Sequence, residues 1–193
     1  MTQDIDLTKR IVTGFFSTFN YVDQAGDILL PGCAAKSIAA RGPNSPATGK
    51  IKHLLHHDPT QLPGRIIHLE ERRVNGSQGI YFETKMSQTA LGEETLIKYQ
   101  EGIYDNHSIG YNYIPSKTAM ASPGTKLWDM TLELIRNPED MRTRDEVFIV
   151  SEIDLYEGST VFLGTNFNTP YFGCKAKSTQ QEMYDYMIKH FKM

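Results

Sequence analysis

The chain has 193 residues, 39% of them hydrophobic and 22% charged, which is the composition of an ordinary globular protein, and we expect one domain over residues 1–193. Its formal net charge of −3 and its pI near 6.1, with no run of Lys or Arg, exclude nucleic acid as a primary partner, because no basic field would attract phosphates. The first residues lack a signal-peptide core and no apolar stretch is long enough to cross a bilayer, which excludes a membrane partner.

The first half of the chain predicts short strands separated by turns, with one helix. Aromatic, β-branched and alternating apolar residues predict strands over residues 11–21, 28–30, 52–57, 64–70 and 79–86. Helix-forming residues from Cys33 to Arg41 predict a short helix that Gly42 and Pro43 end. Asn75-Gly76 is the turn signal of a tight hairpin between the last two strands.

The second half continues this pattern. Acidic residues at 93 and 94, Lys98 and Gly102 predict a helix through residues 96 and 97, and strands are expected over residues 106–114, 147–155 and 159–163. Between them, residues 119–146, which contain Trp128, are expected to form an extra hairpin or packing element. Ser178 with Gln181 resembles a capping box and predicts an amphipathic helix at about residues 178–192. The only cysteines, at 33 and 174, predict reduced thiols in a cytoplasm.

Three histidines are concentrated at His53, His56 and His57, directly before Asp58. Histidine suits general-base chemistry because its ordinary pKa lies near neutral pH. On a strand, His53 and His57 share one face and His56 lies on the other, so the imidazoles do not converge on a metal. A helical segment leaves a metal site open, although the sequence lacks the Glu of the zincin motif, and ordinary surface histidines are a third interpretation.

Serine hydrolysis needs a hydroxyl, a base and a third group that orients the base. Ser108, in Asn106-His107-Ser108-Ile109-Gly110-Tyr111, has no Gly-x-Ser-x-Gly elbow around it and by itself would be an ordinary strand residue. Only the order of several segments along the chain distinguishes it. These segments are Asp23-Gln24-Ala25-Gly26-Asp27 with Pro31-Gly32, then Leu54-Leu55-His56-His57-Asp58-Pro59, then His107-Ser108-Ile109-Gly110-Tyr111, and finally Leu155-Tyr156-Glu157-Gly158-Ser159-Thr160-Val161.

In this order, from about Gly14 to Pro170, the segments resemble the prohead proteases of tailed phages, a family distantly similar to the herpesvirus assemblins. The resemblance implies a mostly β, α+β fold: a compact antiparallel β-barrel flanked by several helices, which the rhythm of turns and strands permits. It also implies a serine endopeptidase with Ser108 as nucleophile and His57, the histidine directly before Asp58, as general base. No cofactor or metal is required.

The third catalytic residue is less well defined by the resemblance, because assemblins use a second histidine at this place. By motif position we expect Glu157, with Asp154 next and Glu152 as a further alternative. The backbone near Gly164-Thr165 is a candidate for the donors that stabilise the oxyanion.

The resemblance implies that the substrates are the scaffold and the N-terminal extension of the major capsid protein, with self-cleavage, inside a procapsid in the host bacterial cytoplasm. A homo-oligomer is left open, since the terminal helix would cover either the barrel or a neighbouring subunit. One alternative keeps the fold without the enzyme, as a capsid-assembly or scaffold-associated protein. Another is a metal-dependent hydrolase built on His53, His56, His57 and Asp58.

Overall fold

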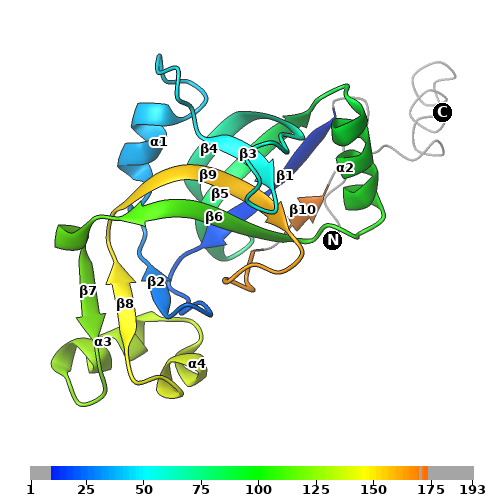
Figure 1. The fold of residues 1–193 in the computed structure, drawn as a ribbon. Coiled ribbons are helices and arrows are strands. Elements are labelled where there is room, and N and C mark those ends of the chain that lie inside the picture. The colour runs from blue at the N-terminus through cyan, green and yellow to red at the C-terminus, as the bar shows by residue number, and fades with distance from the viewer. Residues whose placement is uncertain (1–9, 170, 174–193) are drawn as a thin grey trace, which may run out of the picture.

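The strands of the protein form three sheets, seen in the computed structural model of Figure 1, which describes residues 10–169 and 171–173. The strands are β1 (Ile11–Thr18), β2 (Asp27–Leu29), β3 (Lys52–Leu55), β4 (Gly64–Val74), β5 (Ser77–Met86), β6 (Asn106–Tyr113), β7 (Thr118–Ala121), β8 (Val147–Val150), β9 (Ile153–Val161) and β10 (Tyr171–Gly173). The helices are α1 (Ala35–Arg41), α2 (Ala90–Gln100), α3 (Lys126–Leu134) and α4 (Pro138–Arg142), with a 3-10 turn η1 (Pro115–Lys117).

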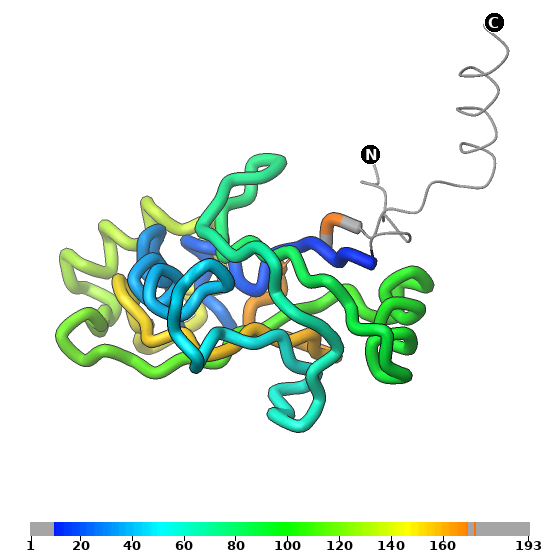
Figure 2. Tube along the Cα trace, turned by 90° about the horizontal axis from the view of Figure 1, so that it is seen from above, coloured from blue at the N-terminus to red at the C-terminus, as the bar shows by residue number. Residues whose placement is uncertain are grey.

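The four-stranded sheet has the order β10-β1-β5-β4 and contains the predicted hairpin. Asn75 and Gly76 have φ angles of 51° and 84°, the left-handed pair that a two-residue hairpin turn requires. The turn lets β4 and β5 pair antiparallel from Gly64 opposite Met86 to Val74 opposite Ser77. Seen from above, this hairpin projects from the body of the molecule (Figure 2).

The second sheet, in the order β3-β9-β6, packs against β1. A Cβ atom on Gly158 of β9 would lie 2.4 Å from the ring of Phe16 on β1, so the two backbones approach this closely only because residue 158 is glycine. The Phe16 ring stacks on Phe82 of β5 with 3.9 Å between centroids. Aromatic side chains between the two sheets therefore form the centre of the main core.

The structure is mostly β with several helices, as expected, but among the described residues no sheet closes on itself, so the predicted barrel is not confirmed. The hydrogen-bonded ladders end at β10, β4, β3, β6, β2 and β7, and the sheets cover one another with side chains rather than by continuous pairing. Antiparallel pairing predominates, but β2 pairs with β8 and β3 with β9 in parallel. The alternation of apolar residues does not reveal strand direction, so these two pairings were not predicted.

Of residues 119–146, the first three belong to β7, which pairs antiparallel with β8, and the rest connect the two strands through α3 and α4 rather than through a tight hairpin turn. The side chain of Thr125 caps α3 by accepting a hydrogen bond from the Trp128 amide at 3.2 Å. Trp128 is buried with Met141 of α4 and Val147 of β8 in a second apolar cluster, so the segment is the packing element that was the other expectation. In Figure 1 α3 and α4 lie below the sheets β10-β1-β5-β4 and β3-β9-β6.

Two of the predicted strands have other ends in the structure. The strand expected over residues 52–57 stops at Leu55, and the one over 147–155 is divided into β8 and β9. Cys33 is a buried free thiol, and burial raises its pKa. The helix expected at about residues 178–192 and Cys174 lie outside the described residues.

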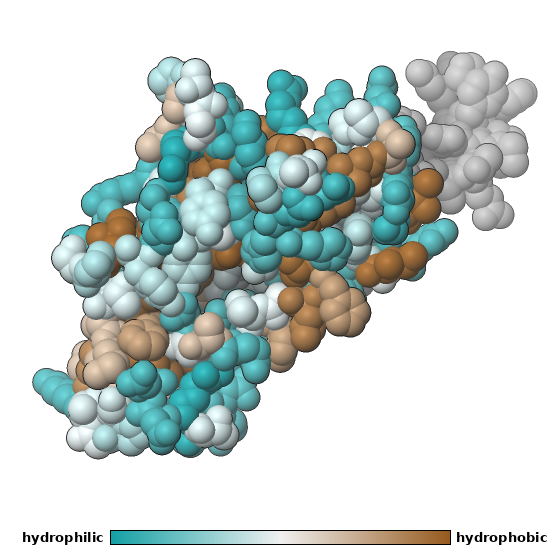
Figure 3. Space-filling view, viewed as in Figure 1, coloured by the Kyte–Doolittle hydropathy of each residue, from teal (hydrophilic) through white to brown (hydrophobic). Residues whose placement is uncertain are grey.

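The face of the molecule in Figure 3 is largely hydrophilic, with apolar side chains gathered where the loop after β9 lies. In that loop Phe162 is 86% exposed and Leu163 is 61% exposed. Thr165 and Asn166 of the same loop line the cavity described below, so this exposed apolar surface lies next to the cavity along the chain. Of the helices that the structure describes, none is long and apolar enough to span a membrane.

Two histidines, His53 on β3 and His107 on β6, are fully buried. The ring nitrogens of His53 contact Thr84 Oγ1 and Thr160 Oγ1, each at 2.8 Å, and His107 Nε2 contacts the Tyr99 hydroxyl at 2.9 Å. Burial lowers the pKa of His107 to about 4 and the pKa of His53 well below its ordinary value of 6.5. Both side chains are therefore neutral at physiological pH.

This burial predicts a loss of stability in acid. An unfolded chain binds protons on these histidines below pH 6.5 and the folded chain does not, so the free energy of unfolding falls as pH falls from 6.5 toward the folded pKa. We expect His107 alone to contribute a loss of about 2 to 3 kcal/mol between pH 7.5 and 4.5. Urea unfolding across this range measures it. His107→Gln should flatten the dependence, and the control His68→Gln, which changes a half-buried histidine on β4, should not. An equal slope in all three proteins would refute the assignment.

Candidate active site

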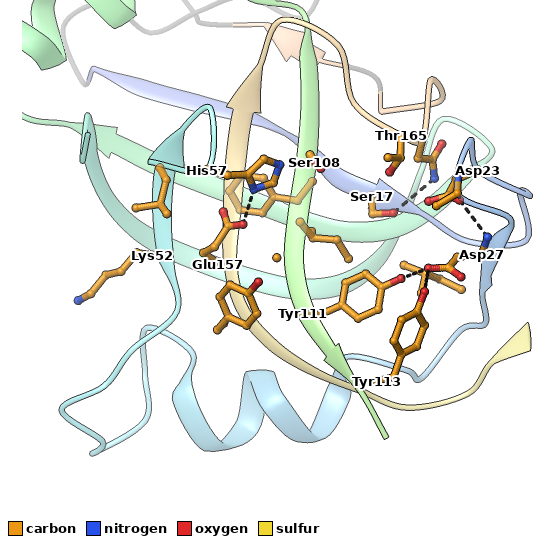
Figure 4. Close-up of a pocket in the computed structure, with 18 of the residues that line it drawn as sticks. Ser17, Asp23, Asp27, Lys52, His57, Ser108, Tyr111, Tyr113, Glu157 and Thr165 are labelled. Carbon is orange, nitrogen blue, oxygen red and sulfur yellow. Dashed lines mark hydrogen bonds and ion pairs between the residues drawn. The ribbon is translucent and has the colours of Figure 1, made fainter. Parts of the chain in front are cut away.

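A cavity of about 840 Å³ lies over β6 and β9 and contains most of the polar residues singled out from the sequence. His57, Ser108 and Glu157 border it together (Figure 4). At its other end it is bordered by Asp23, Asp27, Tyr111 and Tyr113. The cavity therefore joins the candidate reaction centre to an acidic end, along the length of β6.

His57 lies just beyond the end of β3 and is turned back over β9. His56 and His57 have φ angles of 54° and 59°, a left-handed conformation that non-glycine residues adopt at a cost of roughly 1 to 2 kcal/mol each. The turn is held by the His56 amide, which donates to the Thr160 carbonyl at 2.8 Å. His53 and His57 therefore do not share a strand face, contrary to the prediction, because β3 has already ended.

The His57 ring is oriented by a carboxylate. His57 Nδ1 lies 2.6 Å from Glu157 Oε1, and Glu157 is 5% exposed. An ionised carboxylate only accepts, so Nδ1 carries the proton and Nε2 is left with its lone pair. This hydrogen bond is the main cause that raises the pKa of His57 above 6.5, with a further contribution from the Glu157 charge, while partial burial lowers it.

Ser159, which the sequence analysis did not single out, joins the two residues. Its hydroxyl donates to Glu157 Oε2 at 2.7 Å and accepts from the His57 amide at 3.2 Å. Residues two apart on a strand point to the same face, so the Glu-x-Ser spacing of 157 and 159 contained this signal. Ser159 fixes the carboxylate that orients the ring and also the backbone that carries the ring.

Gly110 leaves room for the carboxylate. It is the register partner of Glu157 in the β6–β9 pair, and a Cβ at this position would lie 2.3 Å from Glu157 Oε1. A side chain here would displace the oxygen that contacts His57. A glycine is required at position 110 because the Glu157 carboxylate occupies the space of a Cβ atom. Backbone conformation does not require it, since Gly110 has no positive φ.

Ser108 lies on the same face of the sheet as Glu157 and Ser159. It is the register partner of Ser159, and paired residues of antiparallel strands point to the same side. Ser108 and His57 border the same cavity, but within the described chain no hydrogen bond joins their side chains. Such contacts are often long in unliganded enzymes and tighten when substrate binds.

The structure separates the other candidates from this site. Asp154 pairs with Arg41 and Glu152 with Lys36, and neither borders the cavity. The four residues of the metal alternative diverge: His53 is buried against Thr84 and Thr160, whereas the His56 ring packs on Tyr104. Within residues 10–169 and 171–173, no group of three or more metal-binding side chains is gathered. From the sequence, the backbone near Gly164 was a candidate oxyanion donor. In the structure the Gly164 amide donates instead to Asn106 Oδ1 at 2.9 Å, so it is not free to bind an oxyanion.

The acidic end of the cavity was not anticipated as part of the site. Asp23 Oδ1 accepts hydrogen bonds from the amides of Ala25 and Asp27, each at 2.9 Å, and closes the turn before β2. The hydroxyls of Tyr111 and Tyr113 on β6 both donate to Asp27 Oδ2. The pKa of Asp23 is raised, first by burial, with the Asp27 charge adding to the effect. In the sequence, Asp23 and Asp27 belong to the first of the ordered segments and had no predicted role in the site.

A serine hydroxyl, an imidazole and a buried carboxylate at one cavity are the groups that serine hydrolases use. The family model described as caudovirus prohead serine protease matches residues 1–183. The chain therefore belongs to the caudovirus prohead serine protease family, and it is a serine peptidase of phage capsid maturation.

Among curated proteins none matches the sequence. Among solved structures, the chain is similar to the KSHV protease in complex with a hexapeptide phosphonate inhibitor, with a TM-score of 0.43 and 12% sequence identity over 94% of this chain and 75% of that one.

Proposed function

We propose that the protein is an endopeptidase in which Ser108 is the nucleophile, His57 the general base and Glu157 the group that orients the base. The observation that carries this proposal is the 2.6 Å contact between His57 Nδ1 and Glu157 Oε1 at the cavity that Ser108 borders. It leaves Nε2 as the nitrogen able to take a proton. Glu157 is preferred over Asp154 and Glu152 because it alone of the three contacts His57.

The proposed reaction is acyl transfer in two steps. His57 Nε2 takes the proton of the Ser108 hydroxyl as Oγ attacks the peptide carbonyl, and Glu157 stabilises the imidazolium that forms. The imidazolium then protonates the leaving amine, the C–N bond breaks and an ester remains on Ser108. Water, deprotonated by the same nitrogen, attacks the ester, and the proton returns to Ser108 as the acid leaves.

The proposed substrates are the scaffold and the N-terminal extension of the major capsid protein, with self-cleavage, inside the assembling procapsid in the host cytoplasm. Support comes from membership of the prohead serine protease family. A cavity of about 840 Å³ open along β6 has room for several residues of an extended peptide, as an endopeptidase requires.

The test is co-expression of the full chain with the capsid and scaffold proteins of its phage, followed by mass spectrometry of the products. Wild type and Ser116→Ala, which changes an exposed serine of η1, are expected to process both proteins, and Ser108→Ala neither. Equal processing by Ser108→Ala would overturn the serine mechanism. No processing by any of the three proteins would favour the non-catalytic assembly protein, and processing that stops with a chelator would favour the metal-dependent hydrolase.

A further inference from the structure

Asp27 has an incompletely satisfied carboxylate at the far end of the cavity from His57. The residue is 4% exposed, and its Oδ2 accepts from the hydroxyls of Tyr111 and Tyr113. Its Oδ1 is enclosed and has no hydrogen-bond partner. A buried carboxylate oxygen normally has a donor, because an unmatched one costs free energy. This end of the cavity therefore lacks a donor or a positive charge.

Within the described part of the chain, no charged side chain supplies the missing partner of Asp27. No ion pair within 4.0 Å involves Asp23 or Asp27 there. Arg144 donates to the main-chain oxygen of Asp23 at 2.7 Å and not to either carboxylate. Lys52, the cavity's one lysine or arginine among the described residues, points away from this end in Figure 4. The two aspartates thus make the far end acidic.

The cavity also has apolar walls. Phe16, Leu29 and Ile109 line it together with Ser17, and Leu29 and Phe16 are nearly fully buried. A lysine or arginine side chain has an apolar stem and a charged head, and it prefers a site with this division. A shorter neutral side chain would use the walls without reaching the carboxylates.

We infer that the Asp27 end of the cavity is a specificity subsite that takes a lysine or arginine side chain of the substrate peptide. This rests on the proposed function, since it places the peptide over Ser108. Tyr111 is three residues beyond Ser108 on β6, or roughly 10 Å at about 3.3 Å per residue. An extended peptide lying along β6 advances by the same step, so the basic residue falls about two to four positions from the cleaved bond.

The test uses the full chain and a peptide library made by digesting a bacterial lysate with glutamyl endopeptidase. New termini are identified by mass spectrometry, and the frequency of Lys and Arg is compared at each position around the cleaved bonds. Two synthetic peptides that differ only by Lys or norleucine at the enriched position then give kcat/KM. The variants are Asp27→Asn, which keeps an oxygen for the two tyrosines, and Asp145→Asn, which removes one exposed charge outside the cavity.

For wild type and Asp145→Asn, we expect basic residues to be enriched at one position and the Lys peptide to be cleaved about 10-fold or more faster than the norleucine peptide. Asp27→Asn should lose the preference, so that it cleaves the Lys and norleucine peptides at similar rates. Equal slowing of both peptides, or no basic preference in the wild type, would overturn the subsite. Labelling of Ser108 by a fluorophosphonate distinguishes these results from failure of the proposed function, because an unlabelled Ser108 would overturn both.

Discussion

Replacing His57 with asparagine is expected to lower kcat for peptide cleavage by about 10⁴-fold or more, the loss typical when a triad base is removed. Asparagine tolerates the left-handed backbone that His57 adopts, so the turn after β3 should survive. It cannot take the Ser108 proton at neutral pH. The rate is measured by mass spectrometry on a cleaved capsid-protein peptide, with circular dichroism to verify the fold.

His56→Asn is the matched control for this variant. His56 is the preceding residue, has the same left-handed backbone and is exposed, with its ring packed on Tyr104. We expect its kcat to stay within a few-fold of the wild-type value. A comparable loss in both variants would show that the turn matters and that the His57 imidazole does not.

The second large effect is expected from Glu157→Gln, which we predict lowers kcat by about 10³-fold to 10⁴-fold and moves the pH profile. The carboxylate favours imidazolium, and its hydrogen bond raises the pKa of His57. The enzyme acts with neutral His57, so its activity rises as pH increases through this pKa. Without the negative charge the pKa falls, and the rising limb should move to lower pH even as the maximum rate drops.

The pH dependence of kcat/KM reports this pKa in the free enzyme. Asp154→Asn, which removes a carboxylate that contacts Arg41 rather than His57, is the control, with a limb and a rate close to those of the wild type. A limb that stays in place or moves to higher pH in Glu157→Gln would contradict the role of Glu157. A large loss in Asp154→Asn would instead support that residue as the third member.

The candidate site depends on three strands that are far apart in the sequence. β9 provides Glu157 and Ser159, β6 provides Ser108 and the space at Gly110, and the turn after β3 provides His57. Parallel pairing aligns β3 with β9, with Leu55 opposite Thr160. Two residues further on, the left-handed turn brings His57 back to Glu157. A shift of one residue in either pairing would send one member to the opposite face.

Local sequence determined most of the elements. The Asn75-Gly76 turn, the helix around residues 96 and 97, and the strand that carries Ser108 were predicted because turn residues, caps and apolar spacing act over a few positions. The order of the motifs likewise predicted the family and the type of enzyme, which the family match confirms. The roles of Ser108, His57 and Glu157 remain predictions for the experiments above.

Tertiary structure decided what depends on contacts between distant residues. The end of β3 at Leu55 is coupled to hydrogen bonds of the next two residues with β9, which no alternation of apolar residues reveals. The open sheets, the parallel pairs and the choice of Glu157 over two nearby carboxylates follow from which strands become neighbours. The same holds for Asp27, which had no predicted role in the site and which folding places against Tyr111 and Tyr113 in the cavity that Ser108 borders.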